Sequence, residues 1–375
     1  MYKLDLTKYL KELELLVNID SGSTTPKGIE KVAEFFKNKY AQMGWFVKMH
    51  KFDEALGPCL EARNIDQKEI DLLLIGHMDT VFPEGTAKER PFTIKGDIAY
   101  GPGVVDMKSA LLSMYYVLES LNFNKFEKLP AICVALNSDE EISSIYSKEW
   151  IKELAKKSKY AVVLEPARKN GALVKERKGI LKYNIEFTGV AAHAGANPQD
   201  GISAITELGY WIGELDKLND LEAGTTVNVG VVSGGTVPNV VAEKANAVVD
   251  VRFKTENAMK KVEEAVEKLA KNPKLNGIKI NITKPGFRPP MKVSKEMGKL
   301  YKIIDGIGET LNIHIEWVAT GGGSDANLTA FMGVPTVDTL GPVGGGAHGI
   351  HEYLEINSIE PRVNLLREFM ITLFK

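Results

Sequence analysis

The apolar positions in the first half of the chain form short continuous runs that alternate with a helical repeat. Runs within residues 71–80, 129–141 and 159–167 are rich in aliphatic side chains, which predicts buried strands. Residues 107–121, between the first two runs, place apolar side chains at helical spacing. This alternation of strand and helix is typical of an α/β sandwich with a largely parallel sheet.

After residue 176 the pattern changes to alternating segments that are bounded by turns, with two helical repeats among them. The expected strands lie within 179–190, 225–235 and 246–253, and the expected helices within 201–217 and 256–271. Such a meander with two helices predicts a separate α+β unit of roughly 110 residues.

Beyond residue 291 helix and strand alternate again, up to a last helical repeat at 358–374. We therefore expect the α+β unit, residues 176–287, to be inserted into a first domain that consists of residues 1–175 and 288–375. The length of 375 residues, 44% of them hydrophobic, exceeds what one core usually serves and agrees with two domains.

Charge and cysteine content narrow the class of protein. The net charge of -2, from 47 basic and 49 acidic residues, lacks the basic footprint of nucleic-acid binders and predicts a small partner. Cys59 and Cys133 stand beside apolar residues, which indicates buried thiols and a reducing compartment rather than disulfides or a thiolate metal site. Residues 1–23 repeat apolar side chains at helical spacing, which predicts an amphipathic helix of a cytoplasmic protein without a membrane partner.

Polar side chains with metal-binding chemistry follow the expected strands. They are His77, Asp79, Asp106, Glu140, Glu141 and Glu165. Because ligands of open α/β sheets collect at the carboxyl ends of the strands, we expect these side chains to meet in one crevice. Imidazole and carboxylates without thiolate indicate a divalent metal site, most naturally zinc, with manganese or cobalt as substitutes. So many ligands favour a pair of ions bridged by one carboxylate, as in sites that hydrolyse amides and phosphates.

Taken singly, some of these residues have ordinary structural explanations. Asp79 could cap a turn, Asp106 could cap the helix that follows it, and Glu165 could be a paired charge. For His77 the alternative is a buried histidine with its hydrogen bonds satisfied. The series as a whole favours the metal site.

Nine motifs carry a resemblance that covers essentially the whole chain. In order they are GHMDTVFPEGT, GPGVVDMK, NSDEE, VLEPA, AAHAGANPQDGISAI, TTVNVGVVSGGTVPNVVAEKANAVVDVR, GFRPP, GGGSDAN and AHGIHEYL. In this order and spacing they resemble the M20 family of metallopeptidases, most closely its glutamate carboxypeptidase branch. The resemblance implies a zinc-exopeptidase-like α/β/α catalytic domain with an inserted α+β dimerisation, or lid, domain. It also implies a homodimer that forms through residues 176–287.

The same resemblance implies two zinc ions in each subunit. The expected ligands are His77, Asp106 and Glu165 for one ion, and the bridging Asp106 with Glu141 and His348 for the other. Asp79 would orient His77, because a metal-bound imidazole usually donates its other N–H to a carboxylate or carbonyl. AHGIHEYL offers His351 as well, but the H-x-x-x-E register selects His348.

The adjacent glutamates would divide two tasks. Glu141 would turn toward the metal, whereas Glu140 would take the proton of the metal-bridging water and deliver it to the leaving amine. Successive side chains of a strand point to opposite sides, so neighbours at a strand end supply both directions.

Four further residues match family residues near the substrate. They are His193, Asn239, Arg252 and Arg288. His193 would reach the oxyanion from the neighbouring subunit, although a capping or surface histidine is the alternative. Arg288 would hold the free carboxylate of the substrate through parallel N–H bonds. Asn239 and Arg252 match polar residues at the substrate end of the site, with a strand-end ion pair as the alternative for Arg252.

The glycine-rich stretches ATGGGSDAN and LGPVGGGAHGIHE lack the spacing of dinucleotide or phosphate-binding loops, so we interpret them as active-site loops. Three hypotheses for the function follow. The first is a zinc carboxypeptidase that removes a C-terminal, glutamate-like residue from a small peptide or N-acyl substrate. The second is an N-acyl amino acid amidohydrolase, a deacetylase or desuccinylase, with the same site. The third is a catalytically silent metal-binding protein, against which the presence of Glu140 and every expected ligand argues.

Overall fold

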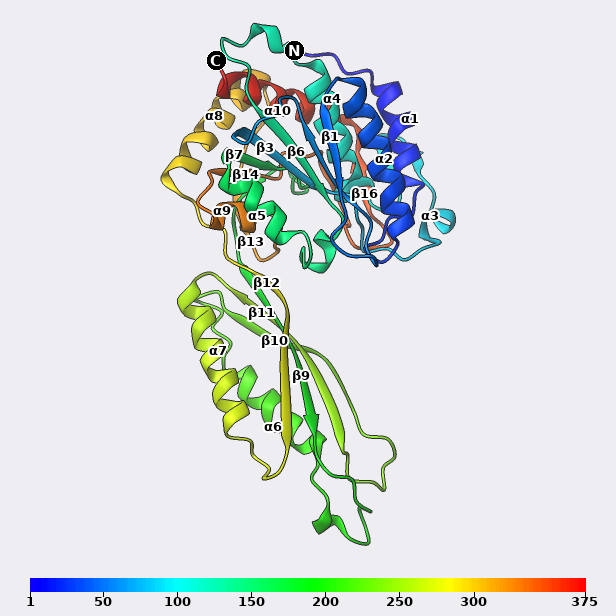
Figure 1. Ribbon diagram of the computed structural model, residues 1–375, viewed down its shortest axis with the longest axis vertical. Coiled ribbons are helices and arrows are strands. Elements are labelled where there is room, and N and C mark those ends of the chain that lie inside the picture. Colours follow the sequence, from blue (N-terminus) through cyan, green and yellow to red (C-terminus); the bar gives the residue numbers. More distant parts are fainter. The chain divides into compact units, whose positions relative to one another are not determined.

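The computed structural model describes residues 1–375, which form two compact units. Unit 1 comprises Met1–Glu176, Met291–Thr320 and Ser324–Lys375, and unit 2 comprises Arg177–Pro290 and Gly321–Gly323. Figure 1 shows the elements of both units. The expected mixed α/β class is confirmed. No helix combines the length and the apolar character needed to cross a lipid bilayer.

A six-stranded sheet in the order β1-β2-β6-β3-β7-β14 forms the centre of unit 1. Its strands are β1 (Phe46–His50), β2 (Cys59–Arg63), β3 (Ile70–His77), β6 (Ile132–Asn137), β7 (Ser158–Val163) and β14 (Thr336–Asp338). β3 is parallel to β6 and β7, and β14 is parallel to β7. β2 runs antiparallel between β1 and β6. The carboxyl ends of β3, β6 and β7 therefore meet at one edge of the sheet.

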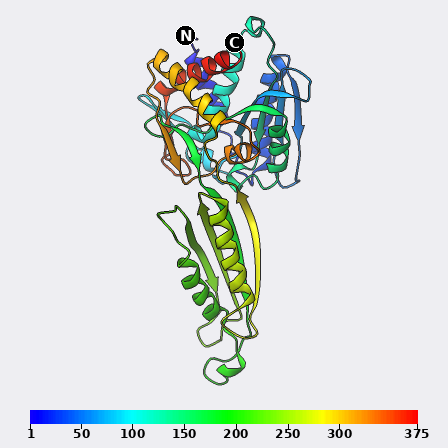
Figure 2. The ribbon, with the colours of Figure 1, turned by 90° about the vertical axis from the view of Figure 1, so that its left-hand side faces the viewer.

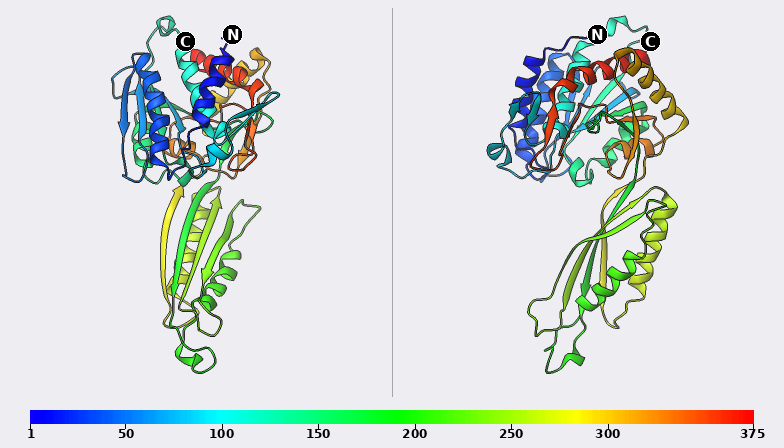
Figure 3. Two further views of the ribbon diagram at one scale, coloured as in Figure 1. Left: turned by 90° about the vertical axis from the view of Figure 1, so that its right-hand side faces the viewer. Right: turned by 180° about the vertical axis from the view of Figure 1, so that it is seen from behind.

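Helices cover both faces of this sheet, and β6 is accordingly buried at every position. α4 (Ser109–Ser120) packs against β3, and α5 (Lys148–Lys156) and α9 (Ala326–Phe331) pack against β7. α5 and α9 stand in front of the sheet in Figure 1, whereas α10 (Ile359–Leu373) is in front in the view from behind (Figure 3). The remaining helices of unit 1 are α1 (Leu6–Val17), α2 (Pro26–Gln42), α3 (Thr86–Glu89) and α8 (Lys295–Leu311).

Two small sheets complete unit 1. One is antiparallel, with the order β15-β16-β5-β4, and the other pairs β13 with β8. Their strands are β4 (Thr93–Lys95), β5 (Ile98–Tyr100), β8 (Leu173–Arg177), β13 (Trp317–Thr320), β15 (Gly344–Gly345) and β16 (Tyr353–Glu355). Since β16 pairs with β5, the loop between β15 and β16 lies beside the turn that follows β5.

Unit 2 is a four-stranded antiparallel sheet in the order β10-β11-β9-β12, with two helices on one face (Figure 2). Its elements are β9 (Gly179–Thr188), α6 (Ala204–Asp216), β10 (Thr226–Gly234), β11 (Lys244–Phe253), α7 (Glu256–Lys271) and β12 (Lys279–Arg288). Alternate residues of β9 are buried, and Phe187 meets Trp211 of α6 edge to face at 5.4 Å between ring centroids. This pattern is typical of a sheet with one face on the core.

β12 was not among the strands expected from the sequence, and it extends past the expected domain boundary at residue 287. Arg288 pairs with Ile180 of β9 and therefore belongs to unit 2. Unit 1 resumes only at Met291. The pairing of β12 shifts register between Thr283 and Gly286, a bulge that accommodates Pro285 inside the strand.

Candidate metal centre

The five residues expected to bind metal come together in unit 1. His77 is the last residue of β3, and its Nε2 lies 3.2 Å from Oδ1 of Asp106 and 3.9 Å from Oε1 of Glu165. His348, in the loop between β15 and β16, places Nε2 3.3 Å from Oδ2 of Asp106 and 3.1 Å from Oε2 of Glu141. The two oxygens of Asp106 thus face different imidazoles.

The cluster has the spacing of a metal site. Single ligand atoms of His77, Asp106 and Glu141 lie within 4.8 Å of one another, and so do those of His77, Glu140 and Glu165. His77 is 2% exposed, which keeps competing water away from its ring. His77 belongs to both groups, so the candidate ligands form one continuous cluster.

The electrostatics of the cluster favour positive charge. Burial alone would lower the pKa of His77, but its hydrogen bonds to Asp106 and Asp79 raise that pKa well above the usual value. Hydrogen bonds to Asp106 and Glu141 raise the pKa of His348 to about 11. The carboxylates that raise these pKa values would also attract a metal cation.

Asp79 connects the histidine to the paired glutamates. Its backbone carbonyl lies 2.9 Å from Nδ1 of His77, and its carboxylate lies 3.5 Å from the same nitrogen. The carboxylate accepts N–H bonds from Glu140 and Glu141, both at 3.1 Å, and the hydroxyl of Ser23 at 2.7 Å. The backbone carbonyl therefore makes the shorter contact with the ring, and the side chain holds the glutamate turn.

The glutamates do not lie at the end of a strand, which corrects the expectation from the sequence. β6 ends at Asn137, and Glu140–Ile142 form a single helical turn of the 3-10 type. Ser143 follows with a φ of 75°, a left-handed conformation that glycine adopts more easily. The different directions of the two carboxylates arise from this turn rather than from strand alternation.

His193 and Asn239 lie together within unit 2. Nδ1 of His193 accepts N–H bonds from Gly195 at 3.1 Å and Ala196 at 3.0 Å, so the neutral ring carries its proton on Nε2. The carbonyl of Asn239 accepts the N–H of Ala194 at 2.9 Å. The exposed His193 ring caps a turn and leaves Nε2 directed away from it.

Arg252 and Arg288 lie on β11 and β12, where both pair with Ile180 of the strand between them. Arg252 forms a two-pronged ion pair with Asp250, with contacts of 2.6 and 2.9 Å. Arg288 is 2% exposed. The ion pair that was the alternative to a substrate role for Arg252 is therefore present.

One buried carboxylate was missed in the sequence. Glu352 accepts backbone N–H bonds from the turn that carries Asp106, and it stands four residues after His348. Glu352 is the glutamate of the H-x-x-x-E spacing. In the sequence, that spacing served only to choose His348 over His351, and the glutamate was given no role. His351 is exposed, and no contact joins it to the cluster.

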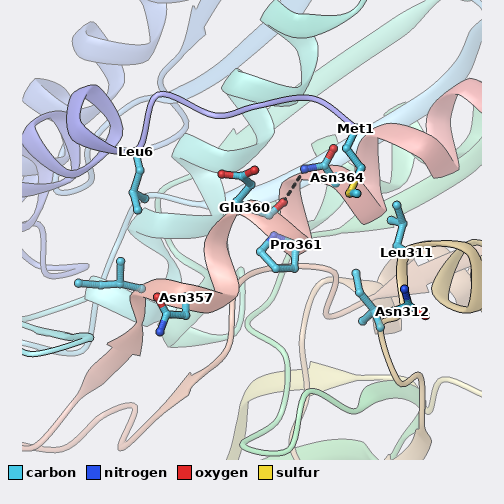
Figure 4. Close-up of a pocket in the computed structure, with 10 residues that line it drawn as sticks. Met1, Leu6, Leu311, Asn312, Asn357, Glu360, Pro361 and Asn364 are labelled. Carbon is cyan, nitrogen blue, oxygen red and sulfur yellow. Dashed lines mark hydrogen bonds between the residues drawn. The ribbon is translucent and has the colours of Figure 1, made fainter.

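Two cavities of unit 1 differ in what surrounds them. A cavity of about 280 Å³ borders the candidate ligands and is lined by Gly22, Ser23, Thr24, Thr80, Val81, Phe82, Pro83, Glu141 and Ile142. Another, of about 390 Å³, lies among α1, α8 and α10, where Asn364 donates to the carbonyl of Glu360 (Figure 4). None of its lining residues belongs to the candidate site, so the first cavity is the one relevant to the chemistry.

Comparison with known proteins identifies related sequences and folds. The profile of peptidase family M20/M25/M40 matches residues 73–372. Carboxypeptidase G2 of Pseudomonas sp. (strain RS-16) is 29% identical over 97% of this chain and 89% of its own length. Succinyl-diaminopimelate desuccinylase of Polynucleobacter necessarius is 28% identical over 81% of this chain and 82% of its own. An M20 family metallo-carboxypeptidase of Sulfolobus solfataricus has the same fold, with a TM-score of 0.78, 18% identity, and coverage of 97% and 98%.

Proposed function

Since this chain belongs to peptidase family M20/M25/M40, we propose that it is a dinuclear zinc carboxypeptidase that releases a C-terminal, glutamate-like residue. The substrate would be a small peptide or N-acyl amino acid. The observation that carries the proposal is the carboxylate of Asp106, whose oxygens face His77 on one side and His348 on the other. A carboxylate in this position is suited to bridge two cations.

The donor set fits zinc, with cobalt or manganese as substitutes, because it consists of imidazoles and carboxylates. His77, Asp106 and Glu165 would hold one ion, and Asp106, Glu141 and His348 the other. When bound, the ions would lower the pKa of an attacking water and polarise the scissile carbonyl.

Glu140 is the group we assign to proton transfer. Its carboxylate lies near His77 and Glu165, so it is close to the candidate metal position. Its neighbour Glu141 contacts His348, and we therefore assign metal binding to Glu141 and proton transfer to Glu140. As the water oxygen bonds to the carbonyl carbon, Glu140 accepts the proton of the water. It then delivers that proton to the leaving nitrogen as the C–N bond breaks, which yields a carboxylic acid and an amino acid.

Arg288 is the group we assign to the free carboxylate of the substrate. A guanidinium offers parallel N–H donors to a carboxylate, and burial strengthens the pairing. Arg288→Ala should cost on the order of 2 to 5 kcal/mol in transition-state binding. A substrate amidated at this carboxylate should be poor for the unmodified enzyme and lose little more in the variant, so equal losses for both substrates would exclude this role.

The distance between Arg288 and His193 supports a homodimer. Arg288 pairs with Ile180, whereas His193 follows Thr188 at the other end of β9. Ile180 and Thr188 are roughly 26 Å apart at ~3.3 Å per residue. One small substrate cannot touch both side chains of one subunit. If both act on the substrate, His193 must come from the partner.

The edge strand β10 offers a surface for this dimer. It pairs only with β11, and Val231 and Val232 are 60% and 52% exposed. Ile205 and Ile212 of the adjoining α6 are also exposed. An unpaired edge beside apolar side chains is suited to isologous pairing with a second copy.

The second candidate is an N-acyl amino acid amidohydrolase with the same site, which the similarity to a desuccinylase favours. Both activities cleave an amide close to a carboxylate, so the ligands and Glu140 would serve either.

Metal analysis and a substrate panel test the proposal together. The purified protein should bind two zinc ions per subunit, lose hydrolysis on exhaustive chelation, and regain it with zinc or cobalt. The panel should contain N-acyl glutamates, dipeptides, folates, and acetylated and succinylated amino acids. Activity in metal-stripped protein would contradict the metal mechanism, whereas turnover of acetylated or succinylated substrates alone would select the amidohydrolase.

A further inference from the structure

Glu352 is a buried carboxylate whose hydrogen bonds go to one short turn of backbone. Its side chain accepts the N–H of Gly103 at 2.8 Å on Oε2, and those of Val105 at 2.9 Å and Asp106 at 3.0 Å on Oε1. The residue is 2% exposed. Burying a carboxylate costs free energy unless donors surround it, and here the donors belong to the turn that carries the central ligand.

The turn needs this carboxylate because its backbone is irregular. Gly103 has a φ of 73°, and a Cβ there would lie 2.6 Å from Cγ2 of Thr80. Asp106 has a φ of -115° and a ψ of 92°, which are not helical values. The regular helix α4 begins only three residues later, at Ser109. The N–H groups that a regular helix would use are therefore directed to Glu352, which satisfies them together.

The same glutamate is tied to the opposite ligand through the chain. Glu352 closes the loop in which His348 lies, and its N–H contacts the carbonyl of Gly349 at 3.4 Å. Asp106 and His348 come from segments 242 residues apart in the sequence, by the difference of their numbers, and must meet with a 3.3 Å contact. Glu352 belongs to the segment of His348, and its side chain binds the backbone of the segment that carries Asp106.

We propose that Glu352 is a positioning residue that fixes the direction of Asp106 relative to His348 and thereby presets the distance between the two metal positions. The inference rests on the proposed metal centre. Side chains that orient metal ligands typically contribute 10- to 100-fold to metal affinity. Because Glu352 touches neither the ions nor the substrate, its loss should act on the metal centre and on turnover more than on substrate binding.

The test compares Glu352→Gln and Glu352→Ala with the unmodified protein. Glutamine keeps the size and one acceptor oxygen, but its NH₂ would face an N–H of the turn. Glu355→Gln is the matched control, because Glu355 lies in β16, three residues on, and its carboxylate contacts no ligand of the site. Zinc affinity and stoichiometry would be measured by competition with a chelator, together with kcat, KM and the Tm of the metal-free protein.

We expect Glu352→Gln to weaken zinc binding about 10- to 100-fold, most for the more weakly held ion. With zinc in excess, kcat should stay at least tenfold low while KM changes less than twofold, and Glu352→Ala should lose more. The control should match the unmodified protein.

Unchanged zinc affinity and kcat in Glu352→Gln would overturn the inference. A fall in the Tm of the metal-free protein with normal zinc affinity per folded molecule would also overturn it, because the role would then be structural alone. If Glu352→Ala does not fold, Glu352→Gln decides. If the unmodified protein binds fewer than two ions, the proposed function fails instead, so the two failures are distinguishable.

Discussion

Nδ1 of His77 lies 2.9 Å from the backbone carbonyl of Asp79, while the Asp79 carboxylate holds the N–H groups of the next pair of glutamates. One residue thus joins the end of β3 to the Glu140–Ile142 turn. The shorter of the two Asp79 contacts to the His77 ring comes from the backbone carbonyl, which no side-chain substitution removes. Changes at the Asp79 side chain should therefore disturb the positions of Glu140 and Glu141 more than the orientation of the His77 ring.

Replacing Asp79 by asparagine tests this division. The variant keeps the backbone carbonyl but turns one acceptor oxygen into an NH₂ group, which cannot accept the N–H of Glu140 or Glu141. We expect kcat to fall about 10- to 100-fold while zinc content stays at the unmodified level. Metal analysis and steady-state kinetics check this, and loss of zinc in proportion to activity would show that the carboxylate itself orients His77.

The adjacent glutamates should give opposite results. Glu140→Gln removes the proton acceptor and should lower kcat by ~10²- to 10⁴-fold with both ions retained. Glu141→Ala removes a contact to His348 and should weaken metal binding as well. Zinc titration of the two variants separates the roles, and metal loss in the first with retention in the second would reverse the assignment.

A mixed dimer tests whether His193 acts across subunits. Glu140→Ala and His193→Ala should each be nearly inactive, but a dimer with one copy of each keeps a site with Glu140 and the partner's intact histidine. The purified, doubly tagged dimer should recover about half of the unmodified turnover per dimer.

The matched control carries both substitutions in one subunit, paired with an unmodified partner. Action across subunits predicts that this dimer is inactive, because each site then lacks one residue. If instead the control is half active and the mixed dimer is not, His193 works within its own subunit.

Glu61 of β2 should make stability depend on pH. Burial alone would raise its pKa, but hydrogen bonds from His50, Arg63 and Trp150 lower it from 4.5 to about 2. A lowered pKa means that the stabilisation is complete above pH 4.5 and is lost as the pH falls toward 2. Glu61→Gln should destabilise the protein by on the order of 2 to 3 kcal/mol at pH 7.

Urea unfolding of both proteins at pH 7, 4.5 and 3 provides the measurement. The difference in unfolding free energy should shrink between the last two values. A difference that stays constant with pH would mean that the Glu61 charge does not carry the effect.

The centre of the fold was readable in the sequence because β3, β6 and β7 are continuous aliphatic runs, with acids and a histidine directly after them. The strands of the small sheet around His348 have two or three residues, too short for any period to show. The H-x-x-x-E spacing marked Glu352, but its role stayed hidden because its partners are backbone N–H groups, which leave no pattern in side-chain identities. Pro285 and Gly286 resembled a domain boundary, but a bulge carries β12 past them to Arg288.

The division of the chain has a consequence for synthesis on the ribosome. The main stretch of unit 2 is contiguous from Arg177 to Pro290, so its sheet can form as soon as β12 has emerged. Unit 1 must wait longer, because its edge strand β14, its helix α10 and the ligand His348 all follow residue 290. We expect the nascent chain to hold an unfinished parallel sheet, with the edge of β7 uncovered, while the insertion is already folded. The edge of β7 therefore stays open to wrong pairing from the time β7 emerges until β14 follows it, while the whole insertion is synthesised in between.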